Sequence, residues 1–109
     1  MLVGSPLYMP LETLQKNIYT EKNDVWSMGI MLFEMLTGDF PFKGKTSKDL
    51  ITQINFTPIK RLIPKRISAE VTEILECLLE KDYKERISFK KLYKLLFPEQ
   101  KKSENRLSI

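Results

Sequence analysis

The chain has 109 residues, of which 42% are hydrophobic and 29% are charged, a balance typical of a folded domain. This length leaves room for one modest hydrophobic core and excludes two full domains. The 18 basic and 14 acidic side chains give a net charge of +4, which permits nucleic-acid binding without implying it. Because the chain has no histidine and one cysteine, it cannot hold a Ser-His-Asp triad, a His-rich or thiolate metal cluster, or an internal disulfide.

The sequence predicts neither secretion nor a membrane span. No basic segment followed by an apolar run opens the chain, and the longest apolar stretch, residues 25–36, is too short and includes Glu34. Cys77 lies among leucines and is expected to be a buried, small apolar residue. A single cysteine that cannot form an internal disulfide is most simply explained by a reducing compartment, so we expect an intracellular, cytoplasmic location.

The first half of the chain predicts a loop and then a buried helix. Residues 1–19 have no sustained period and predict an ordered loop with one helical turn at residues 12–16. Residues 23–37 are apolar on nearly every side of a helical wheel, which predicts a helix buried on all sides. Asp24 at its start and Gly38 beyond its end are typical start and stop signals.

The second half predicts three further helices and no strand. Ser47 is a candidate N-cap for a short amphipathic helix that extends to residue 54. Residues 55–67 contain two prolines and predict an extended loop. Ser68 is expected to cap a strongly amphipathic helix, and Ser88 a last helix that stops at Pro98. The fold class expected is therefore all-α, with four or five helices and a charged, frayed tail at residues 99–109.

Three separated segments resemble the C-terminal lobe of a eukaryotic serine/threonine protein kinase. Residues 4–9 read GSPLYM and are followed by Glu12, residues 24–29 read DVWSMG, and Arg86 comes last. With the intervening GDFPF at residues 38–42, these motifs span nearly the whole chain. We therefore interpret residues 1–98 as a partial protein kinase domain that starts at the end of the activation segment.

The resemblance implies that an acidic residue closes the activation segment and pairs with a distant arginine. In that family the segment ends in an A-P-E triplet, whereas here residues 10–12 read PLE, so that only the glutamate matches. The implied pair is Glu12 with Arg86, and a bidentate arginine–carboxylate pair is suited to hold a loop against a helix.

The resemblance also implies a substrate-binding segment. Its members are Gly4, Ser5, Pro6, Leu7 and Tyr8. Ser5 matches the small hydroxyl residue of serine/threonine kinases, whose hydroxyl would hydrogen-bond the catalytic-loop carboxylate; alternatively it is a turn residue before Pro6. Tyr8 is alternatively a core aromatic.

Three more residues are implied to be structural anchors. Asp24 resembles a buried aspartate that accepts backbone N–H bonds from the catalytic loop; alternatively it is an exposed helix-start residue. Trp26 would fill volume beneath the substrate loop, and Gly29 would permit close backbone approach.

The motifs that carry ATP chemistry in this family have no counterpart in the sequence. Phosphoryl transfer needs a glycine-rich loop, a lysine–glutamate pair, an H-R-D loop and a D-F-G aspartate that holds magnesium. The resemblance therefore implies ATP and magnesium for an intact kinase, and no catalytic, cofactor-binding or metal-binding residue in this chain. We expect the chain to supply the substrate-docking floor of a serine/threonine kinase and to be inactive alone, lacking the N-lobe and the catalytic loop.

Two alternatives remain open. In the first, the chain is a non-catalytic module that recruits a protein substrate or regulator through the residue 4–8 segment and the helix at residues 46–54. In the second, it is a basic helical domain that binds nucleic acid, for which the candidates are Lys60, Arg61, Lys65, Arg66, Lys90, Lys91 and Lys94. These residues lack the interleaved aromatics of single-strand binders, which disfavours the second alternative.

Overall fold

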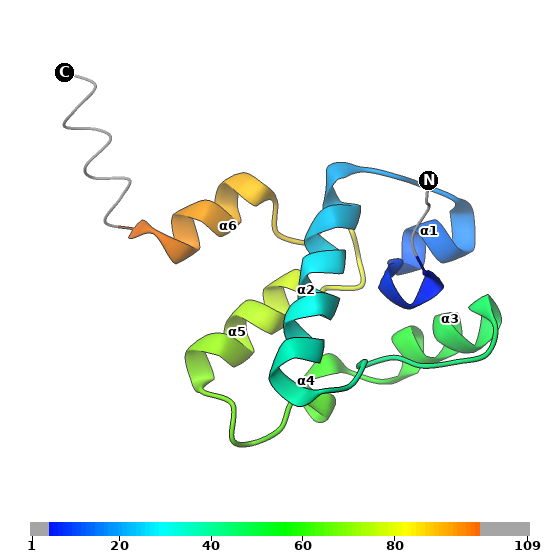
Figure 1. Cartoon of the computed structure of the whole chain (residues 1–109). Helices are drawn as coiled ribbons and strands as arrows, with labels where there is room; N and C mark the ends of the chain where they lie inside the picture. Colours follow the sequence, from blue (N-terminus) through cyan, green and yellow to red (C-terminus); the bar gives the residue numbers. More distant parts are fainter. Residues whose placement is uncertain (1–4, 99–109) are drawn as a thin grey trace.

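The computed structural model describes residues 5–98, and the regular structure of this part of the chain is entirely helical (Figure 1). A 3₁₀ turn, η1 (Pro6–Tyr8), precedes α1 (Leu11–Lys16), α2 (Glu21–Thr37), α3 (Ser47–Phe56), α4 (Ile59–Leu62), α5 (Ala69–Leu78) and α6 (Phe89–Leu96). The expected all-α class is confirmed for these residues. The predicted tail and Gly4 lie outside the described residues.

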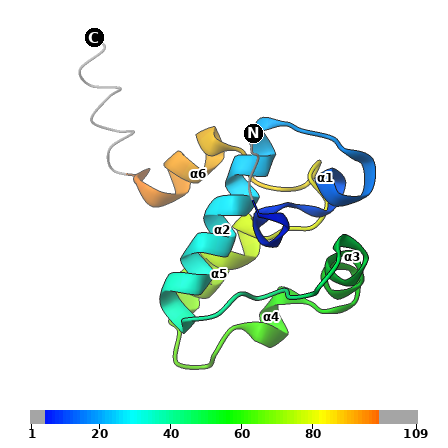
Figure 2. The same ribbon diagram turned by 45° about the vertical axis from the view of Figure 1, so that its right-hand side comes forward.

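Helix α2 forms the centre of the molecule. It packs along α5 and against η1, while α1 packs on α3 and α4 packs on α5. Figures 1 and 2 show α6 beside the first half of α2, with α1 and α3 on the opposite side. This arrangement brings the first and last parts of the described chain to the same central helix.

The hydrophobic core has two parts, both built on α2. The larger cluster consists of Trp26, Ile30, Phe33, Phe42, Leu50, Ile54, Leu75 and Leu79. The smaller consists of Val25, Leu78 and Leu92, and is the core contact of α6. Leu7, Tyr8 and Leu11 pack against the larger cluster, so the segment before α1 lies against the core.

Helix α2 begins two residues earlier than the sequence pattern predicts. The Thr20 hydroxyl accepts a hydrogen bond from the Lys22 N–H at 3.1 Å, and the Asn23 side chain accepts one from the Thr20 N–H at 3.0 Å. This reciprocal capping box, rather than Asp24, sets the start. Gly38 ends the helix with φ +82°, as predicted for a glycine stop.

The crossing of α2 and α5 depends on Gly29. A Cβ atom at this position would lie 2.7 Å from Leu79 Cδ2 and 2.9 Å from Leu78 Cβ. The expected close approach at Gly29 is therefore present, because only a residue without a side chain fits between the helices.

The remaining caps confirm two predictions and correct one, and one predicted loop is partly helical. Ser68 and Ser88 cap α5 and α6 as expected, each through its hydroxyl at 3.2 Å from a backbone N–H. Helix α3 is capped by Thr46, not by Ser47. The predicted extended loop at residues 55–67 is wrong in part, since α3 continues to Phe56 and the short helix α4 follows.

The expectation that α2 is buried on all sides is wrong for the described residues. Met28, Met31 and Met35 are 37%, 46% and 77% exposed. Their spacing places them on one stripe of the helix. Within residues 5–98 these three apolar side chains are therefore at least partly at the surface.

Candidate functional site

The segment before α1 is held in a tight turn at Ser5. The Ser5 hydroxyl accepts a hydrogen bond from the Leu7 N–H at 3.3 Å and so caps η1. Pro6 occupies the first position of this turn, where a missing N–H costs nothing. Ser5 is exposed, so its hydroxyl also faces solvent at the surface of the segment.

Tyr8 ties this segment to α2 through its side chain and its backbone. The phenol O–H donates to Glu34 Oε1 at 3.0 Å, and the Tyr8 carbonyl accepts from Ser27 Oγ at 3.0 Å. The ring packs edge-on against Phe40, with centroids 5.3 Å apart. The hydrogen bond to Glu34 raises the pKa of Tyr8, because ionisation would abolish the donor and place two negative charges together.

Glu12 and Arg86 form the pair that the resemblance implies. Nη1 of Arg86 donates to Oε2 of Glu12 at 2.8 Å, and Nη2 donates to Oε1 at 3.0 Å, across 74 residues of sequence. Glu12 is 5% exposed and Arg86 is 1% exposed. Such a bidentate, desolvated pair fixes both the distance and the orientation of its partners.

Arg86 also binds the backbone around it. Its Nε donates to the Glu80 carbonyl at 2.7 Å, and its Nη1 donates to the Lys22 carbonyl at 2.9 Å. The guanidinium lies 5.1 Å from the ring centroid of Trp26, a cation–π distance. One side chain therefore joins α1, the first turn of α2 and the segment that follows α5.

Trp26 occupies the centre of this arrangement. It is 1% exposed and stacks on Phe42 with centroids 5.9 Å apart and an interplanar angle of 14°. Its position in the larger core cluster, against which Leu7 and Tyr8 pack, agrees with the packing role expected for it.

Asp24 is not in the buried environment that the resemblance implies. It is exposed, and its carboxylate has no side-chain hydrogen bond within residues 5–98. The implied donors belong to a catalytic loop, and no H-R-D motif is present in this sequence. Of the predicted residues, the structure thus groups Glu12, Trp26 and Arg86 closely and leaves Asp24 at the surface.

Sequence reasoning missed Ser27 and Glu34 as partners of Tyr8. Both lie within the apolar helix α2, and Glu34 is a charged residue on a face otherwise suited to packing. A charge within an apolar helix is a signal that a polar partner is near, since burial without one is costly. The partner itself is 26 residues away and has no local signature.

The residues described do not fit an ATP or magnesium site. Between residues 5 and 98 no group of three or more His, Cys, Asp or Glu side chains could hold a metal ion. The full sequence contains no glycine-rich loop that could cradle phosphates. Among the described residues, no helix is long and apolar enough to cross a bilayer.

The fold, the Glu12–Arg86 pair and the motif order define the class of protein. Residues 1–97 match the family model described as protein kinase domain. The chain therefore belongs to the protein kinase domain family.

Several relatives in this family are named serine/threonine-protein kinases. The chain is 39% identical over 90 residues to serine/threonine-protein kinase atg1 of Dictyostelium discoideum, an alignment that covers 83% of this chain and 13% of that protein. It is 34% identical over 95 residues to serine/threonine-protein kinase ULK1 of Homo sapiens (84% and 9%) and 37% identical over 97 residues to serine/threonine-protein kinase ULK3 of Xenopus laevis (88% and 21%). The chain thus spans a small part of the length of each relative.

Proposed function

We propose that this chain is the substrate-docking floor of a serine/threonine protein kinase and has no phosphoryl-transfer activity of its own. The intact kinase would transfer the γ-phosphoryl group of ATP to Ser or Thr of protein substrates, with ATP and magnesium held by residues that this sequence does not contain. The residues of this chain would bind and orient the protein substrate.

The observation that carries the proposal is the fixed position of the residue 5–9 segment. Near the C-terminal end of this segment, Tyr8 is held by Glu34 and Ser27 on α2. Just beyond that end, the buried Glu12–Arg86 pair holds the first turn of α1. A short segment fixed in this way is suited to bind an extended peptide, because a segment that is already ordered loses little entropy when the peptide binds.

The exposed part of the segment determines what it would contact. Ser5 and Pro6 are at the surface, while Leu7 and Tyr8 are half-buried against the core. We propose that the Ser5 hydroxyl lies nearest to the phospho-acceptor, and that Leu7 and Tyr8 shape the pocket for the neighbouring substrate residue. We propose that Gly4, which precedes them, is also part of this substrate-binding segment.

A second contact for a protein substrate or regulator is proposed on α3. Leu50 and Ile54 of this helix are buried in the core, whereas Lys48, Asp49 and Thr52 are exposed. A partner at this face would therefore be bound through polar contacts. The same face would serve the alternative function of a non-catalytic binding module.

A chimera tests the proposal. Residues 1–97 would replace the matching segment of the Dictyostelium atg1 kinase, and the product would be assayed on an array of Ser- and Thr-containing peptides. We expect phosphorylation of Ser and Thr, with a changed preference for the residue next to the acceptor. Replacing only residues 5–8 should reproduce this change.

Two substitutions in the chimera sharpen this test. Tyr8→Ala changes the segment, and Tyr19→Ala is its control, because Tyr19 is 64% exposed and lies outside the segment. Tyr8→Ala should raise KM for peptide about tenfold and leave ATP binding intact, whereas Tyr19→Ala should change neither. A chimera that binds ATP but keeps the peptide preference of its host would contradict the proposal.

A further inference from the structure

Helix α6 and its C-cap residue carry an apolar stripe that is partly at the surface. Its members recur at three- and four-residue spacing and are Phe89, Tyr93, Leu96 and Phe97. They are 38–50% exposed, and the rings of Tyr93 and Phe97 lie 5.2 Å apart, so these two residues are neighbours on one face. We call these four residues the α6 stripe.

Only one side of α6 is packed on the body of the protein. Leu92 is the buried residue of this helix and lies in the smaller core cluster with Val25 and Leu78. Figures 1 and 2 show the helix at the edge of the molecule, on the other side of α2 from α1 and α3. Because Leu92 holds the middle of the helix, a partner can reach the stripe from one side but cannot surround the helix. This geometry favours a flat surface over a groove that encloses a helix.

The polar side of α6 is entirely basic. Helical spacing places Lys90 and Lys94 directly beside the stripe and Lys91 farther round, and the helix contains no acidic residue. All three lysines are exposed. A long aliphatic stem lets an ammonium group stay in water while the apolar side chains beside it are buried in a headgroup layer.

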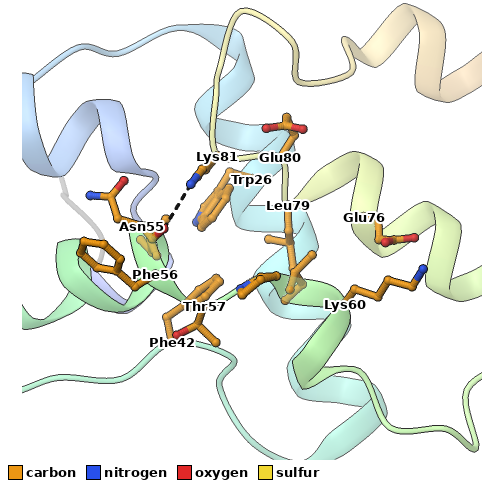
Figure 3. A pocket seen from close by; sticks show the side chains of 13 residues that line it. Trp26, Phe42, Asn55, Phe56, Thr57, Lys60, Glu76, Leu79, Glu80 and Lys81 are labelled. Atoms are coloured by element: carbon orange, nitrogen blue, oxygen red, sulfur yellow. Dashed lines mark hydrogen bonds between the residues drawn. The ribbon is translucent and has the colours of Figure 1, made fainter.

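The two lysines beside the stripe differ from lysines elsewhere in the fold. Lys60 shares the wall of a pocket with Glu76 and Glu80 (Figure 3), and Lys91 lines a second pocket with the same two glutamates. Carboxylates therefore offset the positive charge at these positions. Lys90 and Lys94 line neither pocket, so the basic charge nearest to the stripe remains available to an anionic surface.

We propose that the α6 stripe binds the surface of a bilayer that contains anionic lipids. The helix would lie in the headgroup layer without crossing the membrane, with Lys90 and Lys94 directed at the anionic headgroups. Apolar burial and electrostatic attraction act together in interfacial helices of this composition. Tyr93 suits this depth, because a tyrosine ring has an apolar body and a polar tip.

Flotation of the full chain with vesicles tests the proposal. Vesicles made of equal parts of phosphatidylcholine and phosphatidylserine rise through a sucrose gradient, whereas self-associated protein does not. We expect the chain to float with these vesicles and to float much less with vesicles of phosphatidylcholine alone. Sodium chloride should release the bound chain, because salt screens the attraction between the lysines and the headgroups.

Paired lysine variants test the electrostatic part. Lys90→Gln with Lys94→Gln should weaken binding to the anionic vesicles about tenfold. Lys60→Gln with Lys65→Gln removes the same charge from exposed positions in and after α4 and should have little effect. This control distinguishes the position of the charge from the net charge of the chain.

Paired phenylalanine variants test the apolar part. Phe97→Ser should weaken binding to the anionic vesicles about fivefold, because less apolar surface is then buried in the headgroup layer. Phe56→Ser makes the same change at the end of α3, where the ring is 78% exposed, and should leave binding unchanged.

Three results would overturn the proposal. The first is a wild-type chain that does not float with the anionic vesicles, which is also the result expected if the stripe binds an acidic protein instead. The second is equal binding to the two kinds of vesicle. The third is an equal loss in the two lysine pairs or in the two phenylalanine variants. None of these results depends on kinase activity, so the proposed function would stand or fall separately.

Discussion

At the scale of single residues, Arg86 carries the largest share of long-range polar contacts. Its guanidinium is 1% exposed and binds Glu12, two backbone carbonyls at under 3 Å, and the face of Trp26. A buried cation is tolerated only where nearly every N–H finds an acceptor. The loss of either partner of the pair therefore leaves a charge uncompensated in the interior.

Glu12→Ala and Arg86→Ala should each destabilise the fold by about 3–5 kcal/mol, because each leaves a buried charge without its partner. The double variant should lose much less stability than the sum of the two single losses, since neither charge then remains. Urea unfolding of the four proteins at low concentration, followed by Trp26 fluorescence, measures the free energies. Additive effects would show that the two residues do not stabilise one another.

The pair Asp39–Lys43 is the matched control for this cycle. It is also an ion pair, but its side chains are 59% and 57% exposed. Asp39→Ala and Lys43→Ala should each leave the free energy of unfolding nearly unchanged, because solvent screens an exposed pair. A coupling energy as large as that of Glu12 and Arg86 would mean that burial is not the cause of the effect.

The thiol of Cys77 should react slowly. Burial raises its pKa above the usual value, and the negative charges of Glu73 and Glu76 raise it further. Since the thiolate is the nucleophile, a raised pKa lowers the reactive fraction at any pH below it. Alkylation by iodoacetamide at pH 8 should therefore be several-fold slower in the folded chain than in urea.

Charge variants distinguish the electrostatic part of this effect. Glu73→Gln should speed the reaction of Cys77, whereas Glu70→Gln, one turn earlier on the same helix, should leave it nearly unchanged. A rate in the folded chain equal to the rate in urea would contradict the assigned environment of Cys77.

How far the sequence predicts the site depends on where each partner lies. Glu12 and Arg86 are predictable only through the family motif, because 74 residues separate them and neither shows its burial locally. The contacts of Tyr8 with Ser27 and Glu34 are not predictable, since they depend on how η1 packs on α2. Asp24 is exposed, which matches the alternative of a residue at the helix start, and the donors that the resemblance implies for it are absent from the sequence.

At the scale of elements, the sequence predicts the helices better than it predicts their ends. Ser68 and Ser88 each stand alone before an apolar pattern and cap as predicted. Thr46 and Ser47 are adjacent hydroxyl residues, and either could cap α3 on propensity alone. Helix α4 has four residues and no side-chain cap, so tertiary contact with α5 rather than local sequence explains it.

Gly29→Ala tests the crossing of α2 and α5. Helix propensity alone would favour alanine by about 1 kcal/mol. The added Cβ would lie 2.7–2.9 Å from atoms of Leu78 and Leu79, and relief of such overlap costs about 1–3 kcal/mol. We therefore expect net destabilisation in thermal unfolding.

Met28→Ala is the control for Gly29→Ala, since Met28 is the preceding residue of α2 and is 37% exposed. It should change the free energy of unfolding by less than about 1 kcal/mol. A Gly29→Ala chain that is more stable than wild type would show that α2 and α5 do not approach as closely as described.

At the scale of the whole molecule, the apolar surface is concentrated on two helices. Met28, Met31 and Met35 form the exposed stripe of α2. Tyr93, Leu95 and Leu96 of α6 are 42–44% exposed. The resemblance to kinases implies that a catalytic loop and a preceding helix pack against the central helix of an intact kinase. Such packing would account for the exposed apolar stripe of α2.

The chain alone should bind a hydrophobic dye and associate with itself through this surface. Dye fluorescence and sedimentation at several concentrations measure the two effects. Met31→Lys with Met35→Lys should lower both, whereas Tyr19→Lys, at a residue 64% exposed elsewhere, should not. A monomeric chain that does not bind the dye would show that the methionine stripe is not an apolar association surface.

We propose that this member of the kinase family binds substrate but does not perform phosphoryl transfer. Transfer of label from radiolabelled γ-phosphate ATP to a generic Ser/Thr protein tests it directly, with an intact kinase as the positive control. We predict that the purified chain gives no signal above the blank without enzyme, because the residues that position phosphates and magnesium are absent from the sequence. Transfer above the blank that survives repurification would contradict the claim.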